Sequence, residues 1–326
     1  MNMHIIKRTL VSFLLLLGMS FVTFWLMHAT PGNFFDSLKL NPQISPETIK
    51  RYEDMYHLKD PLFMQYGHWL FNVLRGEFGY SFYYNVPVVD VIGSRLGNTF
   101  ILSLASLLLT WGLAIPLGIW AAVRHGKAAD KIINIFGFAA FSAPSFFLAM
   151  LLLYGFSQWG GLPLGGMHAA NYDDLSGGMK ILDLLKHLVI PSIVLSLASI
   201  ASLQRIMRGN MLAQLGQQYI LAARAKGLPE RRVIYVHALR NAFNPLVTLL
   251  GYEFASLLSG AALVEIVCSW PGLGTLMLTA VRSKDVYVVM ASMLMGGVLL
   301  LLGNILADYL LQKLDPRITQ KSVNNV

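Results

Sequence analysis

Six apolar stretches, each long enough to cross a lipid bilayer, constrain the fold of this chain more than any other feature. A helix needs roughly 20 apolar residues to span the hydrocarbon core. Backbone polar groups find no water in lipid, and the unbroken Leu, Ala, Val and Ile runs lack the alternation of a barrel strand, so each stretch is expected to be a helix. The predicted spans are Thr9–Met27, Thr99–Val123, Ile132–Trp159, His187–Met207, Pro245–Val267 and Val286–Leu311. The predicted fold class is therefore an all-α, multi-pass membrane protein.

The charges of the chain agree with this fold class and give an orientation. Only 13% of the residues are charged, against roughly a quarter in soluble domains. If the N-terminus is cytoplasmic, the segments on its side hold most of the Lys and Arg residues, whereas the short outer loops hold only Lys180, Lys186, Arg282 and Lys284. Basic residues collect on the cytoplasmic side of membrane proteins. We therefore expect both termini to be cytoplasmic, and we assign the net charge of +8 to topology and not to nucleic acid binding.

The first span is expected to be retained, because it ends in bulky residues and not in the small residues of a signal-peptide cleavage site. The predicted organisation has four parts. Residues 1–28 form the cytoplasmic N-terminus and the first span, and residues 29–98 form an extracytoplasmic helical segment. Residues 99–312 form a five-helix core that includes a cytoplasmic loop at 208–243, and residues 313–326 form a cytoplasmic tail.

Two short amphipathic helices are predicted in the extracytoplasmic segment. SPETIKRYEDMYHL has Ser45 at a helix N-cap and Pro46 at the first helical position. PLFMQYGHWLFNVLRG, residues 61–76, repeats an apolar face before its glycines end the helix. The apolar positions of this second helix are Leu62, Tyr66, Trp69, Leu70 and Val73. The pair is expected to pack over the outer mouth of the bundle, either as a plain cap or as a docking surface for an external partner.

Two basic helices joined by a tight turn are predicted in the cytoplasmic loop. Residues from Met211 to Lys226 are strong helix formers, Gly227 fits a left-handed C-terminal stop, and Pro229 with Glu230 suits the start of a second helix. Tyr219, Ala222 and Ala223 are expected to share one face at the i, i+3, i+4 spacing. Two interpretations remain open on this pattern alone. The loop rests on anionic lipid head groups, or its small residues admit a partner protein with an acidic rim.

The same loop resembles the cytoplasmic "EAA" coupling loop of ABC-transporter permease subunits, in particular those of the peptide and nickel importer group. The matching residues are Tyr219, Ala223, Arg224, Ala225, Lys226, Gly227, Leu228, His237, Ala238, Leu239, Arg240, Asn241, Ala242 and Pro245. Leu221 stands where the general pattern has Glu, so that no role of that carboxylate is carried over. HATPGNFF, LKDP, GEFGYSF and VEIVCSWPGLG also look like family landmarks in order, with Cys268 where many relatives have Phe.

The resemblance implies a type I ABC importer permease fold in a bacterial inner membrane. It implies a heterodimer with a second, homologous permease, two ATP-binding subunits, and a solute-binding protein outside the membrane. It assigns ATPase coupling to Tyr219, Ala222, Ala223, Arg224, Ala225, Lys226, Gly227, Leu228, His237, Arg240 and Asn241. Peptides are the first expectation for the cargo, with nickel, glutathione or a metallophore as the alternatives.

The chain is expected to bind no nucleotide or other cofactor itself. Gly126-Lys127 is the one pair that resembles the end of a P-loop, but a Gly five residues earlier and a following Ser or Thr are both missing. ATP and Mg²⁺ are therefore expected on partner subunits, and this chain is not expected to be an enzyme. A helix carrying Ala222 and Ala223 is then the natural lever between an ATPase and the spans.

Carboxylates at membrane depth mark a candidate pathway. Charged groups there are costly and usually face the bundle interior. We expect Glu253 to line the pathway, and Glu265 to anchor the Pro/Gly-rich turn that follows it, which resembles the outer gate of the family. The pathway and gate candidates are Glu253, Glu265, Trp270, Pro271, Gly272 and Gly274. Asp308 lies near the cytoplasmic end of the last span and is expected to snorkel or to pair with Lys313.

Two other classes of membrane protein fit the sequence less well. A secondary transporter ordinarily shows paired repeats with broken or charged helices in each half, and the sequence shows no such repeat. An intramembrane enzyme needs a nucleophile and a base, and neither GxSxG nor HExxH is present. No His or Cys spacing predicts a metal site.

Overall fold

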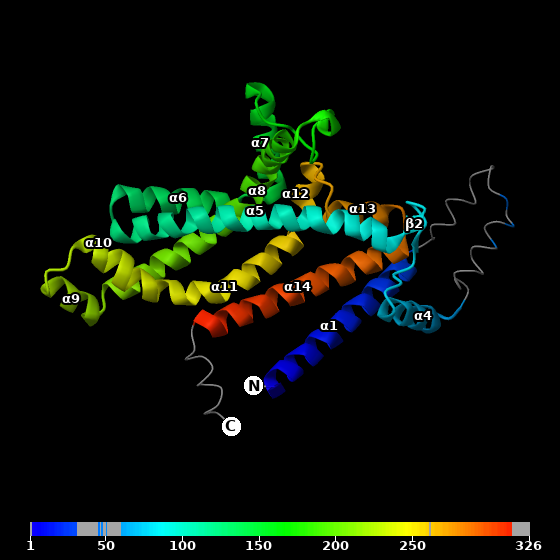
Figure 1. The fold of residues 1–326 in the computed structure, drawn as a ribbon, viewed down its shortest axis with the longest axis horizontal. Coiled ribbons are helices and arrows are strands. Elements are labelled where there is room, and N and C mark those ends of the chain that lie inside the picture. The colour runs from blue at the N-terminus through cyan, green and yellow to red at the C-terminus, as the bar shows by residue number, and fades with distance from the viewer. Residues whose placement is uncertain are drawn as a thin grey trace. The chain divides into compact units, whose positions relative to one another are not determined.

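The computed structural model describes residues 2–30, 45, 47, 50, 60–260 and 262–314. They are mostly helical, as Figure 1 shows, which confirms the predicted helical class. The chain divides into two compact units. The first comprises Met1–Thr99 with Pro271–Leu299, and the second comprises Phe100–Trp270 with Leu300–Val326. The predicted amphipathic helix that begins at Ser45 falls almost entirely outside the described residues.

The first unit is built from helices that meet around a small hairpin. Its elements are α1 (Asn2–Ala29), α4 (Leu62–Leu74), β1 (Tyr80–Ser81), β2 (Val86–Pro87), the start of α5 (Val88–Val123), α13 (Leu273–Arg282) and the first part of α14 (Val286–Leu314). The two strands are antiparallel, with Tyr80 opposite Pro87 and Ser81 opposite Val86. Apolar side chains of α5, α13 and α14 form one core of this unit, around Val88, Leu276 and Val288.

Helix α4 confirms the second predicted amphipathic helix, whose position outside the membrane stays a prediction. Trp69 is buried against Phe24 of α1 and Met290 of α14, and the other four predicted apolar positions pack on the same cluster. The hydroxyl of Tyr66 also lies 2.7 Å from that of Ser20 in α1. The face of α4 is therefore set by the apolar spacing that the sequence displays.

The second unit carries the remaining helices. They are α6 (Ala128–Ser142), α7 (Ser145–Trp159), the short 3₁₀ turn η1 (Tyr172–Asp174), α8 (Gly177–Leu215), α9 (Gln218–Ala225), α10 (Glu230–Arg232), the π-helix η2 (Val233–Ala238), α11 (Leu239–Gly260) and α12 (Ala262–Val267). The rest of α5 belongs to this unit as well. One core, around Leu102, Leu188 and Trp270, joins α5, α7, α8 and α12.

Four helices in the described part of the chain are long and apolar enough to cross a membrane, at Leu10–Ala29, Val88–Val123, Gly177–Leu215 and Val286–Gly303. The pair α6 and α7 makes a fifth if the two are counted as one span. Helices α5 and α8 extend well beyond the predicted spans at 99–123 and 187–207, and both run on through their prolines, Pro116 and Pro191. The sixth span, predicted over 245–267, stays a prediction.

The span predicted over 132–159 is not one continuous helix. Helices α6 and α7 are bent by 106° at a break, which Figure 1 shows as a sharp change of direction. Pro144 lies at the break and Ala143 before it is extended, with ψ 132°. Proline lacks an amide donor and disfavours the helical conformation of the residue that precedes it. The helix therefore breaks completely at this point.

Candidate functional site

The predicted coupling loop does contain a short helix followed by a tight turn, but its first half differs from the prediction. We expected one helix from Met211 to Lys226, whereas α8 ends at Leu215 and α9 begins at Gln218. Gly216 caps α8 and Gln217 is extended, with ψ 150°. Because of this break, α9 is a separate helix of eight residues, and its axis need not continue that of α8.

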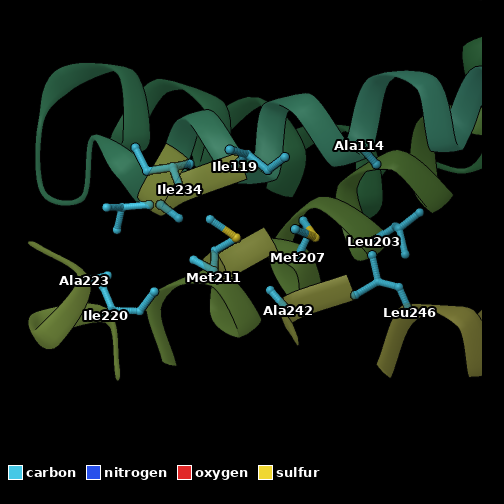
Figure 2. Close-up of a cluster of buried hydrophobic side chains, with 13 residues drawn as sticks. Ala114, Ile119, Leu203, Met207, Met211, Ile220, Ala223, Ile234, Ala242 and Leu246 are labelled. Atoms are coloured by element: carbon cyan, nitrogen blue, oxygen red, sulfur yellow. The ribbon is translucent and has the colours of Figure 1, made fainter. Parts of the chain in front are cut away.

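One side of α9 is buried in a core that we call the α8–α9 core. Its buried members are Ala114, Ile119, Ala122, Leu203, Met207, Met211, Ile220, Ala223, Val233, Ile234, Ala238, Ala242 and Leu246. Figure 2 shows Ile220 and Ala223 of α9 at one end of this core, next to Met211 of α8. Ile220 has no exposed surface, and together with Ala223 it anchors α9 to this core.

Tyr219, Ala222 and Ala223 all lie in α9 at the expected i, i+3, i+4 spacing, but they differ in burial. Ala223 is only 8% exposed and faces the core, while Ala222 and Tyr219 are exposed. Adjacent residues of a helix point about 100° apart, so that Ala222 and Ala223 separate at the edge of the buried side. The buried side is defined by Ile220 and Ala223 at the i, i+3 spacing, and Ile220 was not among the predicted site residues. The outer surface of α9 carries Tyr219, Leu221, Ala222, Ala225 and Lys226.

The turn after α9 follows the prediction closely. Gly227 has φ +74°, the left-handed conformation that glycine adopts without a steric penalty. The amide of Leu228 donates to the carbonyl of Ala223 at 3.4 Å, and that of Gly227 donates to Arg224 at 2.9 Å. Leu228 itself is half-buried and packs on the α8–α9 core. Pro229 then precedes α10, as expected.

An ion pair closes this turn. The Arg224 guanidinium donates to Glu230 through Nε at 3.1 Å and Nη2 at 2.6 Å. This pair holds the pKa of Glu230 below its usual range and raises the pKa of Arg224. Both side chains are well exposed, at 39% and 55%, so the pair adds only modestly to stability. Arg224 thus already has a carboxylate partner within its own loop.

Hydrogen bonds tie α9 to the helices before and after it. The hydroxyl of Tyr219 donates to Oε1 of Gln214 in α8 at 2.8 Å, and Nδ2 of Asn241 in α11 donates to the Tyr219 oxygen at 3.0 Å. Two predicted coupling residues, Tyr219 and Asn241, therefore meet in space although 22 positions separate them. Arg240 is exposed beside them in the chain.

The π-helix η2 (Val233–Ala238) was not predicted. It buries Val233, Ile234 and Ala238 in the α8–α9 core and leads without a break into α11. His237 lies within it, and its Nε2 is buried with no hydrogen-bond partner in the part of the chain that the structure describes. Short π-helical segments occur frequently at functional sites. Nothing in local residue spacing separates such a segment from an ordinary helix.

The gate candidates fall into two groups. In the second unit, Glu265 and Trp270 are completely buried, and the amide of Trp270 donates to the Glu265 carbonyl at 2.8 Å. In the first unit, the carbonyl of Pro271 accepts from Asn98 at 2.8 Å, Gly272 is extended before α13, and Gly274 lies in α13. Glu253 is half-buried in α11. The role of these residues in the pathway stays a prediction.

Comparisons with known proteins identify the relatives of this chain. The family described as "binding-protein-dependent transport system inner membrane component" matches residues 114–320, and the N-terminal family of the same transport systems matches residues 1–105. The oligopeptide transport system permease protein AppB of Bacillus subtilis is 38% identical over 98% of this chain and 99% of its own length. The dipeptide transport system permease protein DppB of Escherichia coli is 33% identical over 94% and 95%.

A solved structure gives the same fold at low sequence identity. A chain of the MetNI methionine ABC transporter, in an inward-facing conformation, matches with a TM-score of 0.54 at 16% identity. The match covers 70% of this chain and 97% of that chain. At this identity the likeness shows the fold alone.

Proposed function

Because the chain belongs to the family of binding-protein-dependent transport system inner membrane components and is a permease component of an ABC importer, we propose that it forms half of a peptide translocation pathway driven by ATP. The other half is a second, homologous permease. Two ATP-binding subunits supply the energy, and a solute-binding protein outside the membrane delivers the peptide. ATP and Mg²⁺ bind to the ATPase subunits and not to this chain.

The observation that carries the coupling part of this proposal is the way α9 is held. Ile220 and Ala223 bury one side of α9 in a core shared with α5 and α8, while Tyr219, Leu221 and Ala222 leave the other side open. A short helix that is rigidly packed on one side and exposed on the other transmits a push from a partner to the helices beneath it. This arrangement supports α9 as the segment that an ATPase subunit grips.

The topology that we propose has six spans with both termini in the cytoplasm of a bacterial cell, in its inner membrane. The four long apolar helices and the bent pair α6 and α7 supply five of them. Helices α11 and α12, which lie on either side of residue 261, supply the sixth. Segment 29–98 then lies outside, where α4 packs against α1.

Peptides are the proposed cargo because relatives that match over nearly the full length are named as oligopeptide and dipeptide permeases. Nickel, glutathione or a metallophore remain the alternatives from the sequence. A secondary transporter is the less favoured alternative class. In the proposed arrangement the external binding protein makes the main choice among solutes.

Reconstitution tests this function. The chain is co-expressed with the second permease, the ATPase subunits and the binding protein of its transport system, and the purified assembly is placed in proteoliposomes. We expect the ATPase subunits to co-purify with this chain, and a di- or oligopeptide to accumulate only with both ATP and the binding protein. Uptake by this chain alone, driven by an ion gradient, would instead identify a secondary transporter.

A further inference from the structure

A buried carboxylate in α6 is fully occupied by donors from three parts of the second unit. Asp130 is 3% exposed. Its Oδ1 accepts from Arg208 Nε at 2.6 Å and from Asn134 Nδ2 at 2.8 Å. Its Oδ2 accepts from Arg208 Nη2 at 2.8 Å and from the amide of Gly126 at 3.0 Å. The turn between α5 and α6, the start of α6 and the last part of α8 therefore meet at one side chain.

The geometry of this pair makes it strong and directional. A guanidinium that donates two parallel hydrogen bonds to one carboxylate fixes both the distance and the orientation of its partner. Nδ1 of His125 lies 2.9 Å from Arg208 Nη2 and 3.3 Å from Oδ2 of Asp130, so that its ring is in contact with both members of the pair. A buried carboxylate in an ion pair is favourable when its remaining hydrogen-bonding positions are filled, as those of Asp130 are by Asn134 and Gly126.

Further contacts continue the junction between α6 and α8. Arg205, one turn before Arg208 on α8, lies over the rings of Phe138 and Phe141 of α6, at 5.0 and 5.1 Å. A Cβ placed on Gly137 of α6 would lie 3.7 Å from Cβ of Ala201, a further turn back on α8. The two helices are thus joined along successive turns, and the Asp130–Arg208 pair is the charged end of that junction.

The same stretch of α8 also supports the coupling helix. Met207 and Met211, which flank Arg208 on α8, are fully buried in the α8–α9 core with Ile220 and Ala223. One side of this part of α8 thus carries α9, while Arg208 reaches to α6. A displacement of α9 therefore reaches α6 through a short and rigid path.

We propose that Asp130 and Arg208 are a positioning pair for energy coupling, which makes the α5–α6 turn and α6 move together with α8 and α9. The pair acts through α8 and touches neither ATP nor the solute. The proposal rests on the proposed function, since it needs an ATPase that moves α9. It differs from a purely structural role in one respect: loosening the pair lowers the amount of solute moved for each ATP hydrolysed.

The test uses the complete reconstituted transporter with two conservative variants. Asp130→Asn removes the charge at nearly constant volume, and Arg208→Lys keeps the charge but loses the forked geometry. Asp173→Asn is the matched control, because Asp173 is an exposed residue of the same unit. Peptide uptake, ATP hydrolysis with and without the binding protein, and thermal stability are measured on each.

We expect both pair variants to hydrolyse ATP at close to the wild-type rate while uptake per ATP falls about tenfold, within the usual range of coupling between sites. The control should keep the wild-type ratio. If uptake per ATP hydrolysed does not change in the pair variants, the positioning role is overturned. This includes the case in which uptake and hydrolysis fall in equal proportion. A wild-type assembly that shows no ATP-driven uptake contradicts the proposed function itself, so that the two failures are distinguishable.

Hydrogen exchange on the wild-type assembly tests the joint movement of α9 and the α5–α6 turn even if the variants do not assemble. When ATP is added, amides of α9 and amides of residues 124–130 should change protection together. A change in α9 that leaves residues 124–130 unaltered overturns the proposal.

Discussion

Arg224 and Glu230 face each other across the turn at Gly227, with Arg224 Nη2 lying 2.6 Å from Glu230 Oε1. The pair joins the last turn of α9 to the first residue of α10. The left-handed conformation of Gly227 sets the direction in which the chain leaves α9, and the ion pair bridges the same turn.

Replacing Gly227 with Val should abolish coupled transport. A Cβ at this position meets no atom within 4 Å, so the cost arises from the backbone alone. A β-branched residue at φ +74° is strained by about 1–3 kcal/mol. Gly227→Asn is the matched control, because Asn tolerates the left-handed region. We expect loss of peptide-stimulated ATP hydrolysis in the Val variant, near-normal values for Asn, and normal membrane insertion of both. Equal activity of the two variants would show that the turn conformation is unimportant.

Replacing Glu230 with Gln should have a small effect that depends on pH and salt. Arg224 lowers the pKa of Glu230, so the folded chain binds this proton less tightly than the unfolded chain. The contribution is therefore present at neutral pH and is lost as the pH falls through the lowered pKa. Because both groups are well exposed, we expect less than ~1 kcal/mol at low salt. Melting of the two proteins in detergent should differ slightly at neutral pH and low salt and converge in high salt or acid. A difference in melting temperature that persists in high salt or in acid contradicts an electrostatic origin of the stabilisation.

Replacing Gly118 of α5 with Ala should destabilise the second unit. The added Cβ would lie 2.7 Å from Cβ of Met207 and 2.8 Å from the carbonyl oxygen of Gln204, both in α8. Overpacking of this kind typically costs about 1–3 kcal/mol. Gly112→Ala is the control, since a Cβ there meets nothing within 4 Å although it lies in the same helix. Thermal melting in detergent should be lower for the first variant only. Equal melting temperatures for the Gly118→Ala and Gly112→Ala variants would mean that α5 and α8 are farther apart at Gly118 than these distances.

Replacing Asp285 with Ala should destabilise the first unit more than replacing Ser81 with Ala. The buried Asp285 carboxylate accepts from Ser81 Oγ at 2.6 Å and from the amide of Tyr83 at 3.1 Å. Asp285→Ala leaves several buried donors without an acceptor, which lowers the free energy of unfolding by about 2–4 kcal/mol. Ser81→Ala removes a single donor and lowers it by about 1 kcal/mol. Asp90→Ala, at an exposed position of the same unit, should change stability by less than ~1 kcal/mol. The order of the three melting temperatures checks the prediction, and an Asp90 variant as unstable as the Asp285 variant would refute it.

Local patterns allowed part of this fold to be predicted from the sequence. The buried face of α4 follows from its apolar spacing, and the stop at Gly227 follows from glycine and proline chemistry, because both depend on residues only a few positions apart. The division at Gly216 was missed, since one glycine costs a helix only about 1 kcal/mol and the neighbouring residues favour a helix. Packing of Ile220 and Ala223 on α8 decides the outcome there.

Contacts between distant parts of the chain were not predictable in this way. Asp130 and Arg208 are 78 positions apart, and Ser81 and Asp285 are 204 apart. Each pair depends on helices that have already packed, and no local spacing reveals it. The difference in burial between Ala222 and Ala223 was missed for the same reason, because only the position of α8 determines which side of α9 is buried.

The central claim is that α9 is a cytoplasmic segment held by an ATP-binding subunit. The most direct test attaches a photoactivatable cross-linker to the cysteine of an Ala222→Cys variant in the assembled transporter, because Ala222 is exposed and Cys268, the one native cysteine, is buried. We expect a cross-link to the ATP-binding subunit, and none from an Asp173→Cys variant in the predicted outer loop. Labelling of the Ala222→Cys variant by a membrane-impermeant maleimide from outside intact cells, with no such cross-link, would contradict this placement of α9.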